Sequence, residues 1–158
     1  MTKPYSIADL RNKLEAALPG AVAGATEAAL LIRPERLVEV CQYLKTTPGL
    51  EFNYLTDVTA VDYVDYFEVN YQLTSLHHRH TTLLKVRVFD RRNAEVPSVV
   101  SVWRGADFQE REIWDLMGIR FVGHPNLKRI LLWEGFPGHP LRKDYFYENV
   151  PGKYATED

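Results

Sequence analysis

Cysteine is almost absent from this chain: Cys41 is the only one among 158 residues. One thiol cannot form a disulfide within the chain. It also cannot by itself hold an iron–sulfur cluster or a thiolate zinc site, because both require several ligands together. We therefore expect this chain to carry neither kind of metal group. The lack of a disulfide framework also favours a reducing compartment.

Long apolar runs and a surplus of one charge are lacking too. No apolar stretch approaches the roughly 18 residues of a membrane-spanning helix, and no apolar core follows the first five residues as it would in a secretory signal. Lys and Arg number 19 against 21 Asp and Glu, a net charge of −2, which argues against nucleic-acid phosphate as the main ligand. We expect one domain, soluble or peripheral to a membrane.

Three familiar functional motifs are missing as well. The sequence has no glycine-rich phosphate loop, no Gly-x-Gly-x-x-Gly run and no Gly-x-Ser-x-Gly nucleophile elbow. These absences argue against a nucleotide site of either familiar kind and against a serine hydrolase.

Two amphipathic helices are predicted in the first third of the chain. The first begins at a capping box formed by Ser6 and Asp9 and ends at Pro19-Gly20. A short strand is expected over residues 28–32. The second helix has Pro34 in its first turn, where a helix tolerates proline. One face of this helix carries Leu37, Val40, Cys41 and Leu44, so Cys41 is predicted to be a small core residue.

The hydrophobic period changes from helical to alternating after Phe52. Strands are expected over residues 54–63, 67–73 and 83–89, and the middle one alternates apolar and polar side chains. Short connections between them predict an antiparallel meander. A turn with His77, His78 and His80 joins the second and third strands, and we interpret it as a solvated polar turn. The fold class expected is α+β, a mostly antiparallel sheet with helices packed on one face.

A third helix and an irregular segment complete the chain. Asp107 and Glu110 predict a capping box, and Gly118 predicts a left-handed stop. Beyond it, glycine and proline interrupt many apolar and aromatic residues, a composition too apolar for a disordered tail. We therefore expect an α+β domain over residues 1–122 and an extended segment over 123–158 that docks on a partner protein.

Charged and imidazole groups of the last third allow several interpretations. Glu110, Glu112 and Asp115 could act as acid–base carboxylates in a stand-alone hydrolase, but a helix-capping Glu110 and a surface pair of Arg111 with Asp115 explain them structurally. A further possibility is a small nucleic-acid adaptor that uses the arginines and aromatics of this region. His124 and His139, each followed by proline, are interpreted as hydrogen bonders that stabilise turns, or as contact residues, rather than as metal ligands.

One long pattern resembles a known family. It reads Glu110-Arg111-Glu112-x-Trp114-Asp115-x-x-Gly118-Ile119-x-Phe121-x-Gly123-His124-Pro125-x-Leu127-x-Arg129-Ile130-Leu131, followed by Gly138-His139-Pro140-Leu141-Arg142-Lys143-Asp144-Tyr145. It is similar to the 30 kDa (C) subunit of respiratory complex I, the NADH–quinone oxidoreductase. The pattern covers roughly the last third of the chain.

The resemblance implies a structural subunit of the peripheral arm, not a catalytic one. It implies no cofactor in this chain, with FMN, iron–sulfur clusters and quinone held by the assembled complex. The partners implied are the 49 kDa (D) subunit and neighbouring iron–sulfur subunits, and the implied location is the cytoplasmic face of the membrane, or the matrix or stromal side in an organelle. Equivalent subunits of ferredoxin-dependent complexes or membrane-bound hydrogenases are the alternative.

The resemblance also implies which residues face the partners. These are Glu110, Arg111, Glu112, Asp115, His124, Pro125, Arg129, His139, Pro140, Arg142, Lys143 and Asp144. Among them, Arg142 is expected to make a planar bidentate bond to a partner carboxylate.

Overall fold

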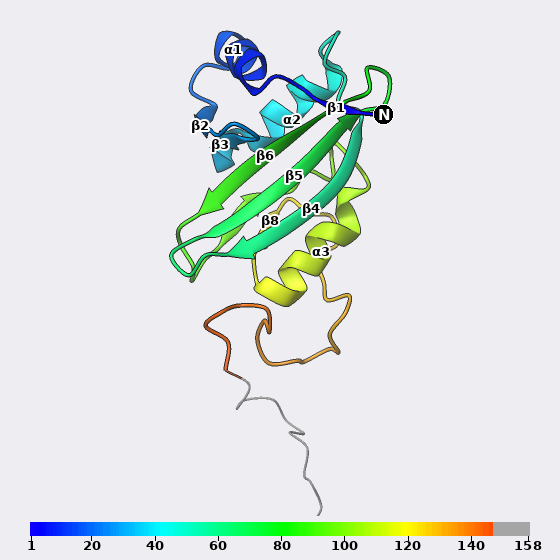
Figure 1. Cartoon of the computed structure of the whole chain (residues 1–158). Helices are drawn as coiled ribbons and strands as arrows, with labels where there is room; N and C mark the ends of the chain where they lie inside the picture. The colour runs from blue at the N-terminus through cyan, green and yellow to red at the C-terminus, as the bar shows by residue number, and fades with distance from the viewer. Residues whose placement is uncertain (147–158) are drawn as a thin grey trace, which may run out of the picture.

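The computed structural model describes residues 1–146, and Figure 1 shows its elements in chain order. They are β1 (Lys3–Pro4), α1 (Ile7–Ala17), β2 (Val22–Ala25), β3 (Leu30–Ile32), the 3₁₀ turn η1 (Pro34–Arg36), α2 (Leu37–Thr46), β4 (Tyr54–Asp62), β5 (Phe67–Ser75), β6 (His80–Val88), β7 (Glu95–Pro97), α3 (Ala106–Met117) and β8 (Arg120–Val122). Of the extended segment expected over 123–158, the part beyond residue 146 lies outside the described residues.

Six of the strands form one sheet around β6. The order is β2-β3-β6-β5-β4, and β1 pairs with β6 as well. The neighbours β4, β5 and β6 are antiparallel, as the meander predicts, whereas β1 and β3 run parallel to β6. A separate small sheet pairs β7 with β8 in parallel. The expected α+β class with a mostly antiparallel sheet is therefore confirmed, and β1 and β2 are strands that the sequence patterns did not predict.

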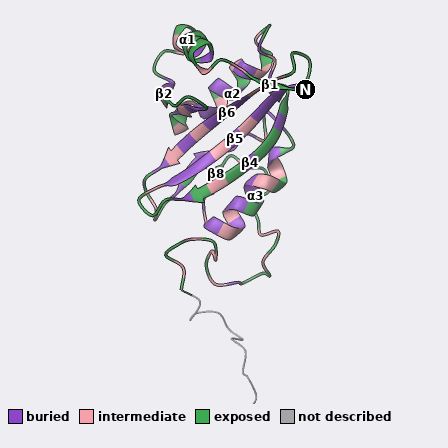
Figure 2. Cartoon of the chain, viewed as in Figure 1, coloured by how far each residue is buried: buried purple, intermediate pink, exposed green. Residues whose placement is uncertain are grey.

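The core lies between one face of the sheet and the helices, where Figure 2 shows the buried positions. On β5 the apolar alternate residues Phe67, Val69, Tyr71 and Leu73 are completely buried. Leu10 and Leu14 of α1 and the predicted apolar face of α2 belong to the same hydrophobic core. Cys41 is completely buried, which confirms the prediction that it is a core residue, and burial raises the pKa of its thiol.

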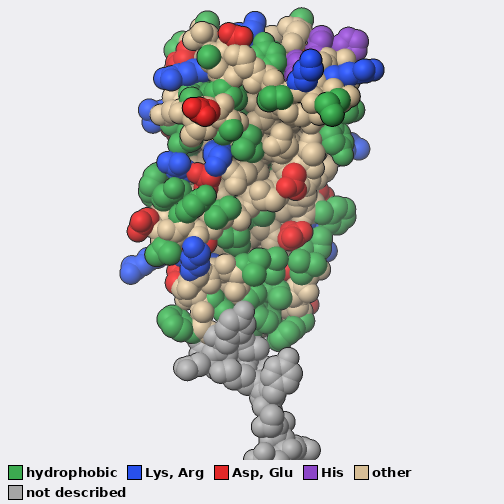
Figure 3. All heavy atoms as spheres, in the orientation of Figure 1, with side chains coloured by type: hydrophobic (Ala, Val, Ile, Leu, Met, Phe, Trp, Pro, Cys, Tyr) green, Lys and Arg blue, Asp and Glu red, His purple; other side chains and the backbone are tan. Residues whose placement is uncertain are grey.

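The other face of the sheet carries polar side chains and is open. Figure 3, in the orientation of Figure 1, shows backbone and uncharged polar side chains across its middle. Thr59, Asn70 and Lys85, from three adjacent strands, help to line a shallow pocket there. Glu68 lies almost buried on this face because Lys85 and Arg87 both pair with it, at 2.7 and 2.9 Å.

The helix ends differ in how well the sequence predicts them. The Ser6 hydroxyl accepts the Asp9 amide hydrogen at the start of α1, as expected. Gly118 ends α3 with φ of 71°, also as expected. The predicted capping box of α3 is wrong: Gly105 is the N-cap residue, without a side-chain cap, and Glu110 points into the protein interior.

α3 also protects the edge of the sheet. β4 is the last strand on its side, and such an edge exposes unpaired backbone groups. The side-chain oxygen of Gln109 on α3 accepts the amide hydrogen of Val58 on β4 at 2.6 Å. In the part of the chain that the structure describes, no helix has the length and apolar character needed to cross a membrane.

Candidate functional site

The family-like residues gather on α3 and on the segment after β8, which folds back beside that helix. Figure 1 shows this segment, residues 123–146, at the end of the molecule away from the N-terminus. It has no regular helix or strand. Its position therefore depends on individual side chains, and three groups of them can be followed atom by atom.

The first group surrounds Glu110, which is completely buried. Its carboxylate accepts the Ser98 hydroxyl at 2.6 Å and the Val99 amide hydrogen at 2.7 Å. Burial raises the pKa of Glu110 to about 7, since the loss of water outweighs the two hydrogen bonds that lower it. Glu110 thus joins α3 to the loop after β7, and neither Ser98 nor Glu110 is accessible enough to act on a substrate.

The second group centres on Asp115, also completely buried. One carboxylate oxygen accepts the amide hydrogens of residues 130, 131 and 132 at 3.0, 2.8 and 3.0 Å. The other accepts Arg129 Nη1 at 2.7 Å. Burial alone would raise the pKa of Asp115, but these amides and Arg129 together hold it below its ordinary value. We call Asp115, Arg129 and the amides of 130–132 the Asp115 clamp.

Arg111 and Arg129 extend this clamp along the segment. Arg111 donates to the carbonyls of Lys128 and Arg129, at 3.2 Å each. Arg129 also donates to the carbonyls of Phe136 and Gly138, at 2.8 and 3.0 Å. The expected surface pair of Arg111 with Asp115 is therefore wrong, because the backbone of the returning segment supplies partners for both. Glu112, between them, is exposed.

The two histidines bond as the turn-stabilising interpretation predicts. His124 Nδ1 accepts the Asn126 amide hydrogen at 3.0 Å, and its Nε2 lies 3.2 Å from the Asp107 carbonyl oxygen. His139 Nδ1 lies 2.9 Å from the Asp115 carbonyl oxygen. Pro125 is exposed and Pro140 is half-buried. Both Gly-His-Pro turns thus return the chain to α3.

The third group centres on Asp62, at the end of β4. It accepts two hydrogen bonds from Arg91, at 2.6 and 2.9 Å, and the amide hydrogens of Val64 and Lys143 at 2.8 and 2.9 Å. The Arg91 guanidinium is the main cause of a pKa for Asp62 well below its ordinary value. We call Asp62, Arg91 and the Lys143 amide the Asp62 clamp, since it ties the far end of the segment to the sheet.

Arg142 and Asp144 take part in the same network. Arg142 donates to Asp144 at 3.0 Å and to the Arg91 carbonyl at 2.8 Å, and Arg91 also pairs with Asp144 at 3.1 Å. The sequence predicts a partner's carboxylate opposite Arg142, whereas the carboxylate that Arg142 contacts in this structure is Asp144 of the same chain. Lys143 is exposed.

The surface of the segment is apolar, in contrast to these internal charges. Leu131, Trp133, Leu141 and Phe146 are 57–74% exposed. We call these four side chains the apolar rim. The partner-facing residues that the family resemblance implies include only motif residues and none of these four. The composition of the segment, apolar residues among too much glycine and proline for a regular element, is the signal from which the sequence predicts that this segment docks on a partner.

The histidine turn and possible metal sites give less evidence of a function. Within residues 1–146, no group of three His, Cys, Asp or Glu side chains could hold a metal ion. At the histidine turn, His78 pairs with Glu51 at 2.5 Å and His80 with the Leu50 carbonyl at 2.8 Å. Two of the three imidazoles of this turn are therefore already bonded to other groups of the chain.

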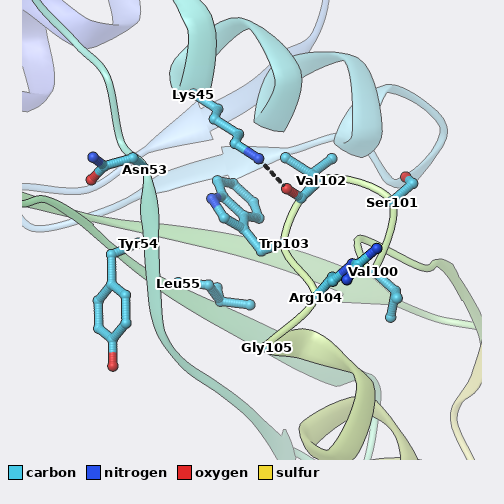
Figure 4. Close-up of a pocket in the computed structure, with 10 residues that line it drawn as sticks. All are labelled: Lys45, Asn53, Tyr54, Leu55, Val100, Ser101, Val102, Trp103, Arg104 and Gly105. Atoms are coloured by element: carbon cyan, nitrogen blue, oxygen red, sulfur yellow. Dashed lines mark hydrogen bonds between the residues drawn. The ribbon is translucent and has the colours of Figure 1, made fainter.

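A surface pocket of about 590 Å³ lies between α2, the start of β4 and the loop before α3, shown in Figure 4. Lys45 points across it and donates to the Val102 carbonyl at 2.5 Å, while Trp103 lies below. Arg104 is the other cation of its lining. No residue of the family-like pattern lines this pocket, so it is separate from the candidate site.

Comparison with known proteins gives consistent results. A family model described as respiratory-chain NADH dehydrogenase, 30 Kd subunit, matches residues 30–150. The second C-type subunit (C 2) of the NADH-quinone oxidoreductase of Rhizobium etli is 50% identical over 117 residues, which is 72% of this chain and 62% of that protein. The C-type subunit from a Roseiflexus species is 45% identical over 144 residues, 87% of this chain and 82% of that one.

Similarity extends to more distant proteins. The C-type subunit from Salinispora tropica is 40% identical over an alignment of 166 positions, which covers 97% of this chain and 67% of that protein. A chain from the membrane-bound sulfane sulfur reductase, an archaeal respiratory membrane complex, superposes with a TM-score of 0.69 at 21% identity. The superposition covers 89% of this chain and 86% of that one, and it shows a shared fold.

Proposed function

This chain belongs to the family of the 30 kDa subunit of respiratory-chain NADH dehydrogenase, and on that premise we propose that it is the 30 kDa (C) subunit of an NADH–quinone oxidoreductase. As such it is one subunit of a multi-subunit, membrane-bound respiratory complex, in which it is peripheral. NADH oxidation coupled to quinone reduction belongs to the assembly. This chain supports the quinone-reducing module and does not itself act as catalyst.

The observation that carries this role is the contrast between the two clamps and the apolar rim. The family-like charges are used inside the chain, where they hold residues 124–146 against α3 and the sheet. The same segment leaves large apolar side chains in solvent. Apolar area stabilises a protein only when something covers it, so the rim is suited to burial against another subunit.

We propose that the motif residues contribute to the interface in two ways. Glu110, Arg111, Asp115 and Arg129 act from inside, by positioning the segment. Glu112 and Lys143 are exposed and can meet a partner directly. The partner we propose is the 49 kDa (D) subunit, with iron–sulfur subunits of the peripheral arm nearby. FMN, iron–sulfur clusters and quinone are then held by other subunits, and the chain lies on the cytoplasmic side of the membrane or its organellar equivalent.

The NADH-dependent assignment is preferred over the alternatives from sequence. The three relatives at 40–50% identity described above are named as C-type subunits of NADH-quinone oxidoreductase. A ferredoxin-dependent complex or hydrogenase has no comparable support. A stand-alone hydrolase is disfavoured because the carboxylates of Glu110 and Asp115 are buried and used as hydrogen-bond acceptors.

The test is replacement of Trp133 by serine in the full, tagged chain. We expect normal folding but affinity for the complex lower by about 30-fold, the loss typical of one central aromatic residue in an interface. Co-purification of the other subunits from membranes and NADH:quinone reductase activity report this loss. The matched control is Tyr54→Ser, since Tyr54 is 50% exposed and begins β4, away from the segment.

Normal complex levels with Trp133→Ser would remove the rim from the interface. A melting temperature measured on each purified variant separates loss of binding from loss of folding.

A further inference from the structure

A second exposed apolar group lies where the β4–β5 turn meets the end of β6. Tyr63, Val64 and Phe89 are 45%, 58% and 66% exposed. The rings of Tyr63 and Tyr66 stack at 5.1 Å, and Phe89 lies 5.3 Å from Tyr66. The Arg87 guanidinium lies 4.9 Å from the Tyr66 ring. We call Tyr63, Val64, Tyr66 and Phe89 the hairpin knob.

Val64 is held in a conformation that its residue type rarely adopts. Its φ is +73°, in the left-handed region that suits glycine or asparagine and that strains a β-branched side chain. The Asp62 carboxylate maintains this turn by accepting the Val64 amide hydrogen. The turn therefore exposes the apolar side chain of Val64 at a position where glycine would be more stable. Local folding does not explain why valine stands there.

The same carboxylate links the hairpin knob to the C-terminal segment. Asp62 Oδ1 accepts the Val64 amide hydrogen, and Oδ2 accepts the Lys143 amide hydrogen at 2.9 Å. Next to it, the guanidinium groups of Arg91 and Arg142 lie 4.4 and 5.0 Å from the ring of Phe67, the first residue of β5. Figure 1 shows the β4–β5 turn at the same end of the molecule as the segment. The knob and the segment are thus linked through hydrogen bonds to the same Asp62 carboxylate.

The composition of the knob fits protein recognition. Tyrosine, phenylalanine and arginine are enriched at the energetically important positions of protein interfaces. Stacked rings also present a large area at low entropic cost, because they are already ordered by one another.

We propose that the hairpin knob and the apolar rim form one composite docking surface for a single neighbouring subunit, which receives Val64 and the knob aromatics in an apolar pocket. The assignment rests on the proposed function, because it takes the rim as part of the interface. It adds a contact made by residues outside the family-like pattern. It also requires one subunit to contact both the hairpin knob and the apolar rim, which Asp62 links.

Site-specific cross-linking in the assembled complex tests the geometry. The photoreactive residue p-benzoylphenylalanine replaces Tyr63 in one full-length chain and Trp133 in another, so that an aromatic side chain is kept in each case. We expect both positions to cross-link to the same subunit, identified by mass spectrometry. The same residue at Tyr54 should not reach that subunit. A knob that cross-links to a different subunit, or to none, overturns the proposal.

Val64→Gly tests the energetics, since it removes the apolar side chain and the strain together. We expect the melting temperature of the purified chain to rise by about 2–4 °C, while incorporation in competition with the unchanged chain falls by about fivefold or more. The matched control is Arg79→Gly, because Arg79 is exposed at φ +54° in the β5–β6 turn. It should gain stability and incorporate normally.

The outcomes separate this inference from the proposed function. Loss of incorporation with Trp133→Ser but not with Val64→Gly would overturn the composite surface and leave the rim interface standing. No loss with either variant would overturn both. A loss with Arg79→Gly equal to that with Val64→Gly would show that backbone relief, not apolar contact, causes the effect, and would overturn the composite surface.

Discussion

The carboxylate of Asp115 bonds to three consecutive backbone amides and to one guanidinium. We expect Asp115→Asn to destabilise the chain by about 2–4 kcal/mol, because the new amide group must leave some of these donors unpaired in a buried place. Urea denaturation measures the loss. Glu112→Gln is the matched control, since Glu112 lies on the same helix but is exposed; a similar change in both variants would contradict the clamp.

Glu110 should make stability depend on pH in the opposite direction to most carboxylates. Its pKa is about 7 in the folded chain against an ordinary 4.5. A raised folded pKa contributes stability that is complete below about pH 4.5 and is lost as pH rises to about 7. Since a tenfold change in a protonation constant is worth about 1.4 kcal/mol, the loss approaches about 3 kcal/mol.

Comparison with Glu110→Gln isolates this effect from other titrating groups. The glutamine carbonyl can still accept the Val99 amide hydrogen. The stability of this variant should not change with pH in the way that titration of Glu110 causes. The unfolding free energy of the unchanged chain, relative to the variant, should therefore decrease between pH 5 and pH 8. Parallel curves would mean that Glu110 keeps an ordinary pKa.

At the scale of the elements, the end of α3 depends on the close approach of His139. A Cβ added at Gly118 would lie 2.5 Å from His139 Cδ2. Gly118→Ala should therefore cost about 2–3 kcal/mol, from backbone strain at positive φ and from displacement of the His139 ring. Thermal and urea unfolding measure it.

Gly20→Ala provides the reference for strain alone. Gly20 has a φ of +77°, and nothing lies within 4 Å of an added Cβ. We expect Gly20→Ala to lower the free energy of unfolding by about 1 kcal/mol. Equal losses at both glycines would show that the His139 contact contributes nothing.

The elements that sequence patterns predict well are those with a regular period. The alternation in 67–73 and the helical faces of α1 and α2 each place apolar residues on one side, and burial follows. β1, two residues long, has too few residues for any period, and it forms because β6 offers it an edge. The Ser98 loop explains the wrong cap of α3: its donors bind Glu110 from another part of the chain, and local spacing cannot reveal them.

The candidate site shows the same division between local and distant information. The pattern picks out residues that the structure brings together on α3 and the returning segment, and the turn-stabilising interpretation of His124 and His139 agrees with their bonds. It did not show that Asp115 bonds to the backbone 15–17 residues further on, or that Asp62 bonds to Lys143. Such bonds depend on how the segment folds back, which is decided by tertiary packing.

For the molecule as a whole, we expect the far end of the C-terminal segment, which the Asp62 clamp ties to the sheet, to open when that clamp is broken. Arg91→Gln removes both bonds to Asp62 and the pair with Asp144. Cleavage by trypsin after Arg142 or Lys143 should become about tenfold faster or more, because cleavage requires local opening. Limited proteolysis followed by mass spectrometry gives the rate.

Arg92→Gln is the control for this experiment. Arg92 is the exposed neighbour of Arg91, and its loss should leave the cleavage rate unchanged. Faster cleavage in both variants, or in neither, would show that the clamp does not hold the segment closed.

The parallel pairing of β6 with β1 and β3 has a consequence for how the chain acquires its structure. β4, β5 and β6 are neighbours in sequence and can pair as soon as they are synthesised, whereas β1 must wait for a strand that begins at residue 80. Pairings distant in sequence close slowly, since a long loop must first be ordered. We expect the amides of the β4–β6 meander to gain protection first in pulse-labelled hydrogen exchange, and the N-terminal strand to join last.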